Sequence, residues 1–361
     1  GGLTTALALT RKDIPFDIYE EAPSLKMLGA GLALGENAIR ALDIVGLGRD
    51  IPWSAQALKG MRLLSADGKK LSENAALAYC IHRADLHTLL LRHIDTHHLH
   101  LGKKCVGVEN LGEKITARFE GGSKAEGRLL VASDGIKSAI RQNLLPDSKP
   151  RYAGYTCFRG VTDAPAECRE LDWASETWTA KGRFGIAPLR NRRVYWYACV
   201  NARETDAEKK NWKTRELLEI FGECHSPIPA LIRATPDKAV IHGNIADLKP
   251  LARHVYGRIL LLGDAGHATT PNLGQGACQA MEDAVVLADK LSSYPNQDEA
   301  LRAYETSRLA RTRKVVVLSR RVGSVAQWSK PIAVALRNAA MRLTPKFLVK
   351  RQTSFLLKPF Y

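Results

Sequence analysis

The chain contains no apolar run that approaches the ~20 residues needed for a membrane-spanning helix, which excludes a transmembrane span of that kind. It has no internal repeat and no low-complexity segment. Its seven cysteines are odd in number and form no Cys-x-x-Cys pair. This pattern argues against a disulfide framework or a zinc ribbon and fits a reducing compartment, so we expect a cytoplasmic protein.

The sequence also lacks the side-chain sets that carry out catalysis by themselves. We find no motif typical of a Ser–His–Asp triad, of paired catalytic carboxylates or of a metal cluster. His93, His97, His98 and His100 lie close together, but no cysteine or glutamate stands beside them at metal-ligand spacing. We interpret them as a solvated helix end and predict no metal site. A bound cofactor is therefore expected to supply the chemistry.

Acidic residues are scarce relative to basic ones. There are 37 Asp and Glu against 53 Lys and Arg, and the formal net charge is +16. Such a balance suits nucleic acid, an anionic membrane surface, or acidic cofactors and small molecules. Because no nucleic-acid-binding motif accompanies it, we predict no nucleic-acid partner. Anionic dinucleotides account for part of the positive field, and a solvated basic surface accounts for most of it.

The most informative stretch runs from Arg258 to Leu291. Ile259–Leu262 is a short continuous apolar run, which is typical of a strand buried on both faces. Gly263 and Asp264 end this strand, a turn of small residues follows, and Gln275–Leu291 has the pattern of a helix. The free N–H groups at the helix start suit an anionic or electron-rich ligand. The Asp264 carboxylate is placed to accept hydrogen bonds from ligand hydroxyls.

The segment GDAGHATTPNLGQGACQAMEDA resembles the second flavin-binding motif of the single-component, FAD-dependent aromatic hydroxylases. That family includes para-hydroxybenzoate, urate and salicylate hydroxylases, tetracycline-inactivating monooxygenase and zeaxanthin epoxidase. The resemblance implies that the aspartate holds a ribityl hydroxyl of FAD and that the Pro-x-x-Gly-x-Gly turn lies against the isoalloxazine. The cofactor-binding residues implied here are Asp264, Pro271, Gly274, Gln275, Gly276 and Ala277.

The N-terminal segment resembles the second half of a dinucleotide-binding βαβ unit. Gly1–Leu9 has small and apolar residues at helical spacing, and Phe16–Glu20 reads as a short strand that ends in an acid. By resemblance, Gly2 is the third glycine of a G-x-G-x-x-G fingerprint, and Glu20 stands where the ribose-binding acid belongs. We therefore expect about ten further residues before Gly1, comprising a strand and two glycines.

Two further motifs resemble those of the same family. Arg83 lies in Ile81–Leu86, which matches the family's Arg-x-Asp-Leu pattern before a helix, and its guanidinium suits the FAD pyrophosphate or the ribityl chain. Asp134 and Gly135 follow a buried strand and precede a helix that contains Arg141. The resemblance implies that Asp134 and Gly135 line the pyrophosphate groove and are linked to NAD(P)H use. The small-residue stretch Gly29–Ala33 is expected to pass the flavin.

The residue pattern changes after Pro146–Pro150, from mixed segments to alternating, aromatic-rich ones, which indicates a domain boundary. The following alternating, aromatic-rich segments predict strands of an antiparallel sheet, which in the family is the substrate domain: Arg151–Thr162, Ser175–Thr179, Arg183–Pro188 and Val194–Val200. A polar helix is predicted over Ala207–Gly222. We predict an α/β fold in which a Rossmann-like, glutathione-reductase-type FAD domain (1–150 and 250–300) carries an inserted substrate sheet (151–249) and C-terminal helices (301–361).

The resemblance implies an enzyme that uses NAD(P)H and O2 to hydroxylate or epoxidise a small aromatic or polyene substrate through a flavin C4a-hydroperoxide. Arg183 and Tyr195 are candidates to face the substrate, because a cation and a phenol suit an anionic or phenolic ring. Asn272 is a third candidate. The urate-oxidising branch carries a carboxylate at that position, and an amide cannot act as a base, so urate is disfavoured. The alternative from another class is a flavin-binding sensor without turnover.

The C-terminal part is basic. Glu299–Arg321 predicts an amphipathic helix, Pro331–Leu343 predicts another, and an apolar tail follows. The basic residues are Arg308, Arg311, Arg313, Lys314, Arg320, Arg321, Lys346, Lys350 and Arg351. The tail is expected to dock on the body of the protein, with weak contact to a membrane surface as the alternative.

Overall fold

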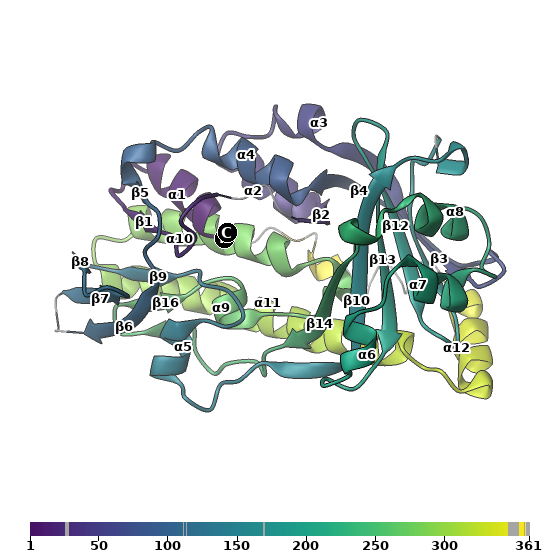
Figure 1. Ribbon diagram of the computed structural model, residues 1–361. Helices are drawn as coiled ribbons and strands as arrows, with labels where there is room; N and C mark the ends of the chain where they lie inside the picture. The colour runs from purple at the N-terminus through teal and green to yellow at the C-terminus, as the bar shows by residue number, and fades with distance from the viewer. Residues whose placement is uncertain are drawn as a thin grey trace.

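The computed structural model describes residues 1–25, 29–110, 112, 114–168, 170–345, 354–356 and 358. Figure 1 shows two regions of β-structure side by side, with helices α10 (Gly276–Ser293) and α11 (Gln297–Ala326) running between them. The mixed α/β class predicted from the sequence is confirmed. No helix in the described part of the chain is both long and apolar enough to cross a membrane.

The other helices are short. They are α1 (Gly2–Thr10), α2 (Glu36–Ile44), α3 (Ile51–Ser54), α4 (Arg83–Leu91), α5 (Ala139–Leu144), α6 (Ala207–Lys210), α7 (Thr214–Phe221), α8 (Ile228–Ala234), α9 (Asp264–His267) and α12 (Pro331–Leu343). Single 3-10 turns are η1 (Thr96–His98), η2 (Ala166–Cys168), η3 (Asp237–Ala239), η4 (Pro271–Leu273) and η5 (Ser354–Leu356).

Within the described residues, the strands form four sheets. They are β1 (Ile18–Tyr19), β2 (Gly31–Gly35), β3 (Gln56–Ser65), β4 (Lys70–His82), β5 (Leu99–His100), β6 (Cys105–Asn110), β7 (Ile115–Phe119), β8 (Lys124–Gly127), β9 (Leu130–Ala132), β10 (Arg151–Asp163), β11 (Ala174–Trp178), β12 (Arg183–Leu189), β13 (Arg193–Asn201), β14 (Ile241–Asp247), β15 (Val255–Tyr256) and β16 (Ile259–Leu261).

The largest sheet has eight strands in the order β14-β10-β13-β12-β11-β3-β4-β2. It is therefore larger than the sheet expected from residues 151–249, because β2, β3 and β4 from the N-terminal part join it. Strands β10 to β13 pair with one another antiparallel, as predicted. The added N-terminal strands bring one parallel pair, since β11 runs parallel to β3 with Glu176 opposite Leu63. Helices α7 and α8 cover one face, where Phe184 and Trp196 pack against Phe221.

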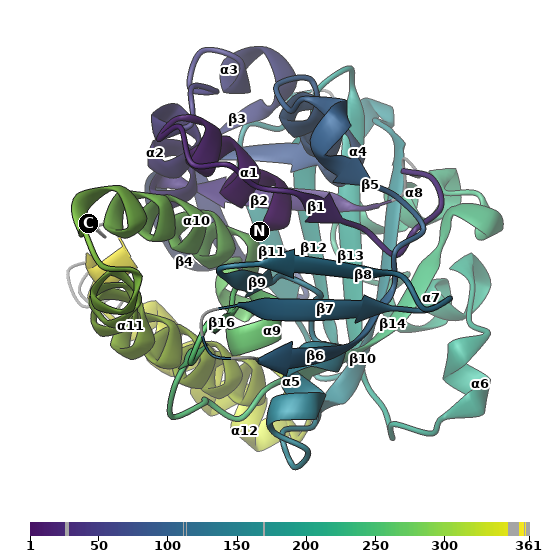
Figure 2. The ribbon, with the colours of Figure 1, turned by 90° about the vertical axis from the view of Figure 1, so that its left-hand side faces the viewer.

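The second region brings together strands that are distant in sequence. β9 and β16 pair in parallel, with Leu130 opposite Ile259 and Ala132 opposite Leu261. β1 pairs in parallel with β5, and β6, β7 and β8 form a separate antiparallel sheet. Helix α1 lies beside α10, as Figure 2 shows. The pairing of β9 with β16 joins the two segments predicted to build the FAD domain; the exact domain division stays a prediction.

The polar helix predicted over residues 207–222 is wrong as a single element. Helix α6 ends at Lys210 and α7 begins at Thr214. The reason is a second helix start: the Glu216 carboxylate accepts a hydrogen bond from the backbone N–H of Lys213 at 2.8 Å. The helix predicted over 299–321 is longer than expected, because the Asn296 side chain caps it by accepting from the N–H of Asp298.

Candidate functional site

Two acidic residues leave the carboxyl ends of neighbouring parallel strands. Ala132 on β9 lies opposite Leu261 on β16, so Asp134 and Asp264 emerge at the same edge of the sheet. Both side chains are exposed. Asp134 accepts weakly from the N–H of Ile140 at 3.4 Å, whereas Asp264 has no hydrogen-bond partner among the described residues. The edge therefore presents at least one free carboxylate to a ligand.

Helix α1 begins directly against this edge. A Cβ added to Gly2 would lie 3.6 Å from the Cβ of Ser133, which immediately precedes Asp134. A Cβ added to Gly1 would lie 3.0 Å from the side chain of Leu262. A side chain at Gly1 would therefore be tight against Leu262, whereas one at Gly2 would make an ordinary contact with Ser133. The role of Gly2 as the third fingerprint glycine stays a prediction.

The two strand ends are tied together by a buried arginine. Arg141 on α5 is fully buried and donates to the backbone carbonyl of Ala265 at 3.0 Å and to that of Ser148 at 3.3 Å. A third contact reaches the carbonyl of Ile136. The guanidinium thus locks the segment after Asp134 to the segment after Asp264, which fixes the spacing of the two carboxylates.

Arg83 is the first residue of α4. Its side chain is exposed, and no hydrogen bond from its guanidinium to a described residue is present. Gly29, at φ +153°, lies so close that a Cβ there would be 2.7 Å from the Cβ of Arg83. The His82 ring bonds the carbonyl of Gly29 at 3.0 Å and holds this approach. Arg83 is therefore a fixed cation whose head group is available to an anion.

Glu20 follows β1, as predicted for the acid at the end of the N-terminal strand. One oxygen of its carboxylate accepts from the N–H of Ala22 at 2.9 Å, and the side chain is half-buried. Glu20 and Arg83 both act electrostatically on His87, so the two lie in one neighbourhood. Of the histidines that lie close together in sequence, His98 and His100 contact Asp17, and the described residues contain no group of three metal-ligating side chains.

The small-residue turn precedes helix α10. Pro271 opens the 3-10 turn η4, and Gly274 adopts a left-handed conformation at φ +62° that favours glycine. Helix α10 starts at Gly276 and has no side-chain cap. Pro271 and Gly274 are exposed and Ala277 is half-buried, so the turn and the first N–H groups of α10 are presented to a ligand.

Gln275, predicted to bind the cofactor, has its side chain turned into the protein. The side chain is buried, and its oxygen accepts from Asn37 at 3.0 Å and from Gln279 at 3.2 Å. Asn37 and Gln279 also donate to Glu282 on the next turn of α10. The side chain of Gln275 is thus held by hydrogen bonds to neighbouring amides and is not available to a ligand. Only the backbone of Gln275 can contact one.

Asn272 connects the turn to the large sheet. Its side-chain oxygen accepts from the Tyr155 hydroxyl at 3.1 Å and from the Arg183 guanidinium, while its N–H groups donate to Thr270 and to the carbonyl of Ser319, each at 2.8 Å. The amide is saturated by protein partners. Asn272 is therefore a bridge between elements in this structure, rather than the free substrate-facing group that the sequence suggested.

Arg183 on β12 is almost completely buried. It donates to Glu176 at 3.1 Å, contacts Asn272, and places its guanidinium carbon 5.0 Å from the ring centre of Tyr155. Its Nε has no partner among the described residues although it is buried. An unpaired buried donor is costly, so this N–H is a candidate contact for a ligand acceptor.

Tyr195 on β13 lies beneath β2. A Cβ added to Gly31 would be 2.3 Å from the Tyr195 ring, so only glycine allows this crossing. Burial raises the pKa of Tyr195, and nearby thiols contribute in the same direction. The phenol is therefore neutral at physiological pH. Arg183, Tyr195 and Asn272 all lie on the face of the large sheet opposite α7 and α8, next to the turn at the start of α10.

A buried ion-pair network behind the turn was not anticipated. Arg308 on α11 donates to Asp283 at 2.7 Å and also contacts Glu282, and all three side chains are inaccessible to solvent. Burial alone would raise the pKa of Asp283, but His267 and Arg308 outweigh it and hold that pKa far below its ordinary value. Asp283 also accepts from the N–H of Gly263 at 3.1 Å, so the network holds the strand end beside Asp264.

Several basic residues of α11 are therefore not a solvated surface, which corrects the sequence interpretation. Arg308 is fully buried, Arg311 pairs with Glu282, and Arg320 donates to Asp247 at 2.7 Å. Arg311 also donates to the backbone carbonyl of Leu356 at 3.0 Å, so η5 docks on α11. The sequence contained one indication of these buried cations. Glu282 and Asp283 stand side by side on an otherwise apolar helix, and two buried carboxylates need cationic partners. Of the basic tail, residues 346–351 lie outside the described residues.

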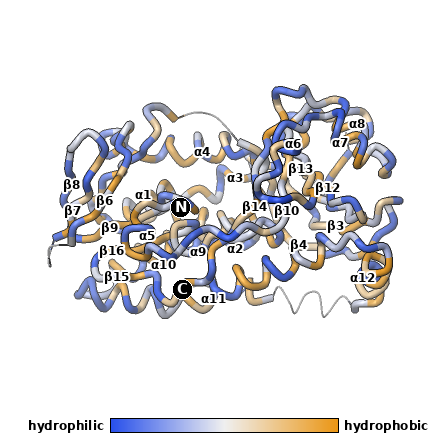
Figure 3. The backbone as a smooth tube through the Cα atoms, turned by 60° about the horizontal axis from the view of Figure 1, so that its bottom comes forward, coloured by the Kyte–Doolittle hydropathy of each residue, from blue (hydrophilic) through white to orange (hydrophobic). Residues whose placement is uncertain are grey.

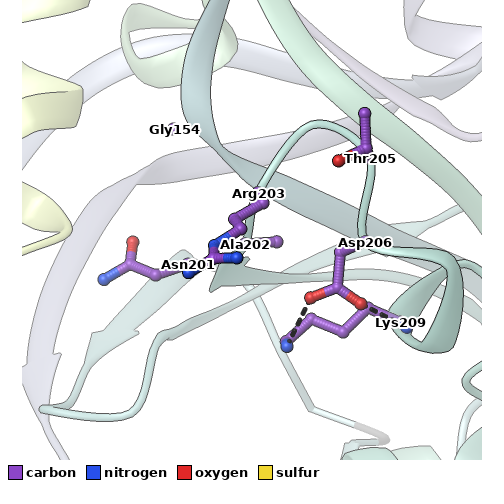
Figure 4. A pocket seen from close by; sticks show the side chains of 7 residues that line it. All are labelled: Gly154, Asn201, Ala202, Arg203, Thr205, Asp206 and Lys209. Carbon is purple, nitrogen blue, oxygen red and sulfur yellow. Dashed lines mark hydrogen bonds and ion pairs between the residues drawn. The ribbon is translucent and has the colours of Figure 1, made fainter.

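A separate open hollow of about 640 Å³ lies at the end of β13, lined by Gly154, Asn201, Ala202, Arg203, Thr205, Asp206 and Lys209. Figure 4 shows Asp206 and Lys209 turned toward each other, and the two charges pair at 2.8 Å. Two of its charged groups thus pair with each other, and it contains none of the residues predicted to bind a cofactor. The groups available to a large anionic ligand are instead those around Asp134, Asp264 and the start of α10.

Comparison with known proteins identifies the family of the chain. A family profile described as FAD binding domain matches residues 1–319. The chain is 38% identical over 362 residues to the aurachin C monooxygenase/isomerase of Stigmatella aurantiaca, covering 98% of this chain and 94% of that protein. It is 31% identical over 359 residues to a 2-heptyl-3-hydroxy-4(1H)-quinolone synthase of Pseudomonas aeruginosa, covering 95% of this chain and 92% of that protein.

Among solved structures, Klebsiella pneumoniae HpxO complexed with FAD and uric acid superposes with a TM-score of 0.92 at 28% identity, covering 100% of this chain and 95% of that chain. The chain belongs to the family of FAD-dependent aromatic hydroxylases and monooxygenases. It is an FAD-dependent monooxygenase. The usual reductant in this family is NAD(P)H. The alternative of a flavin-binding sensor without turnover is not supported by these relatives.

Proposed function

We propose that FAD binds along the edge formed by the ends of β9 and β16 and the start of α10. Asp264 would accept from ribityl hydroxyls, and Arg83 would offset the diphosphate charge. Gly2, Glu20, Asp134 and Gly135 would line the dinucleotide groove, and Pro271, Gly274, Gly276 and Ala277 would contact the ring system through backbone. The availability of these groups supports the fit: the carboxylate of Asp264 and the guanidinium of Arg83 form no hydrogen bond or ion pair with another described residue, and the first N–H groups of α10 have no side-chain cap.

When bound, FAD supplies the redox chemistry that activates O2. The protein has three tasks around it. The N–H groups at the start of α10 favour negative charge beside them. The close packing of Gly31 against Tyr195 would limit the access of water from that side. The buried network of Asp283 and Arg308 keeps the turn and the strand end in fixed positions.

We propose that the substrate is a planar, electron-rich aromatic or heteroaromatic ring that lies on the large sheet beside Arg183 and Tyr195. The observation that carries this proposal is the direct contact between Arg183 and Asn272, because it joins the substrate sheet to the cofactor turn. The unpaired Nε of Arg183 would donate to a carbonyl, phenolate or carboxylate oxygen of the ring.

Among ring systems, a 4-quinolone fits better than urate. One relative is named for a 3-hydroxy-4(1H)-quinolone product, whose ring combines a carbonyl acceptor with an electron-rich carbon. The HpxO structure contains uric acid, but Asn272 stands where the urate-oxidising branch has a carboxylate, and here it is saturated by four hydrogen bonds. An amide in that state offers no base for deprotonating urate.

A panel comparison tests the proposal. The FAD-loaded enzyme would be given NADH or NADPH with 2-heptyl-4(1H)-quinolone, 3-hydroxybenzoate or uric acid, and reductant consumption, O2 uptake and product mass would be followed. We expect oxygen incorporation into the quinolone and none into uric acid. Coupled oxidation of uric acid, or turnover of none of the aromatic rings, would contradict the substrate class while leaving FAD binding as a separate question.

We also propose weak contact of the C-terminal region with an anionic membrane surface, in a protein located in the cytoplasm. Hydrophobic and hydrophilic residues mix along α12 (Figure 3), and Ile332, Leu336 and Leu343 on it are 77%, 66% and 81% exposed. Lys330 and Arg342 flank this exposed face. Vesicles containing anionic lipid should retain the protein, those of neutral lipid should not, and Leu336→Ser should weaken retention. Equal recovery in all three would contradict the contact.

A further inference from the structure

Two cysteines face each other across neighbouring strands of the substrate-facing sheet. Cys157 on β10 is the direct register partner of Cys199 on β13. Both side chains are buried, at 2% and 1% exposure, in a small cluster with Tyr155 and Ile245. The Cys157 thiol donates to the backbone carbonyl of Phe158 at 3.6 Å, and a side-chain hydrogen bond joins Cys157 to Cys199.

The surroundings of the pair are cationic. The Arg159 guanidinium bonds Cys157 from two residues along the same strand, and Arg183 acts electrostatically on both thiols. The hydrogen bond with Cys199, followed by the charge of Arg159, lowers the pKa of Cys157, whereas the same hydrogen bond and burial raise that of Cys199. The lowered pKa would make Cys157 the more nucleophilic sulfur, and its direct register partner Cys199 would be placed to resolve the oxidised form.

The strand geometry suits a disulfide. Side chains directly opposite in an antiparallel pair have Cβ atoms about 4.5–5.5 Å apart, and a disulfide needs about 3.5–4.5 Å. A small inward adjustment of two side chains therefore suffices, with no change of register. The site chemistry also supplies an oxidant, because a flavin monooxygenase that consumes NAD(P)H and O2 without oxygenating substrate releases hydrogen peroxide.

We propose that Cys157 and Cys199 form a peroxide-sensitive thiol pair that is oxidised to a disulfide within the substrate cavity. The Cys157 thiolate attacks one oxygen of hydrogen peroxide, the O–O bond breaks, and, after a proton is taken up, one water leaves. The resulting sulfenic acid is attacked by the sulfur of Cys199, and a second water leaves as the S–S bond forms. Two thiols and one peroxide thus yield one disulfide and two waters. The pair would become oxidised when NAD(P)H and O2 are consumed without oxygenation of the substrate.

The proximity of the pair to the source of peroxide rests on the proposed function, but the thiol geometry does not, so the test has two arms. In the first, reduced FAD-loaded protein receives hydrogen peroxide directly, and intact mass and non-reducing peptide maps are recorded. In the second, the protein oxidises NAD(P)H without substrate in the presence of catalase. The variants are Cys157→Ser and Cys199→Ser, with Cys80→Ser as a matched control, because Cys80 is buried on the same sheet.

We expect loss of two hydrogen atoms from the wild type and from the Cys80→Ser control, a linked peptide containing Cys157 and Cys199, and reversal by dithiothreitol. Both variants at the pair should yield no such link, with Cys199→Ser stopping at a sulfenic acid on Cys157. Failure of the first arm, or a link that survives Cys157→Ser, would overturn the proposal. If added hydrogen peroxide forms the disulfide but NAD(P)H oxidation in the presence of catalase does not, the peroxide sensitivity of the pair is supported and its proximity to the source of peroxide is rejected.

Discussion

The guanidinium Nε of Arg308 on α11 lies 2.7 Å from a carboxylate oxygen of Asp283 on α10, and neither side chain is accessible to solvent. Because both charges are inaccessible to solvent, water could not replace either one if it were removed. Breaking a buried pair by removing one member costs about 3–5 kcal/mol, because an uncompensated charge is left behind. The contact is therefore expected to hold α11 against α10.

Arg308→Met should lower the free energy of unfolding by about 3–5 kcal/mol, because Glu282 and Asp283 would lose their cation. Urea unfolding followed by circular dichroism measures this loss. Arg313→Met is the matched control, since Arg313 lies on the same helix and is exposed. A similar loss in both variants would show that the helix tolerates neither change and that the buried pair is not the cause.

Stability should fall on acidification through His254. Burial, aided by the charge of His267, lowers the pKa of His254 to about 3, whereas histidine in the unfolded chain titrates near about 6.5. Between these values the unfolded state binds the proton and the native state does not. The free energy of unfolding should therefore decrease by up to about 1.36 kcal/mol for each pH unit below about 6.5.

The check is urea unfolding at a series of pH values between about 7 and about 4, for the wild type and for His254→Leu. The variant removes the titrating ring, so its stability should depend less steeply on pH in this range. Parallel profiles would assign the acid sensitivity to other groups.

Asp264→Ala should weaken FAD binding by tenfold or more without loss of the fold. A hydrogen bond to a charged group contributes about 1.5–3 kcal/mol, and the carboxylate has no described partner whose loss would destabilise the protein. Quenching of flavin fluorescence on titration gives the affinity, and urea unfolding of the apoprotein gives the stability. Asp298→Ala, at an exposed position of α11, controls for loss of one negative charge. Unchanged FAD affinity would reject the role of Asp264.

Arg183→Lys should raise the KM for an accepted substrate about tenfold or more while leaving FAD affinity unchanged. The lysine keeps the charge but cannot contact Glu176 and Asn272 together and still offer a donor to the ring. Steady-state kinetics and a flavin titration separate the two effects. Arg190→Lys, outside the sheet face, is the control. A fall in kcat at constant KM would argue that Arg183 only supports the fold.

A chain that ends after Pro345 should be less stable than one that ends after Leu356. Arg311 donates to the backbone carbonyl of Leu356 at 3.0 Å, and the Leu356 side chain is buried. Loss of a charge-assisted hydrogen bond and one apolar contact costs about 2–4 kcal/mol. Thermal unfolding of the two proteins measures the difference. Equal stability would show that η5 contributes nothing to the docking of α11.

Local sequence determined the elements whose formation depends on short-range patterns. The apolar run at Ile259–Leu262, the small-residue turn and the helix after Gln275 were predicted within a residue or two, as were the strands that became β10 to β13. The bounds of α12 match the prediction at both ends. These signals lie within a few residues of one another, where alternation, helical spacing and the conformational limits of glycine and proline act directly.

Contacts between distant segments were decided only by the tertiary structure. Arg308 looked like part of a solvated basic helix until packing placed it against Asp283, 25 residues earlier. Asn272 looked free until Arg183, 89 residues away in sequence, occupied its oxygen. The parallel pairing of β11 with β3 and the register of Cys157 with Cys199 are of the same kind. Sequence patterns report which face of an element is buried; which charges and thiols meet there depends on how the elements pack.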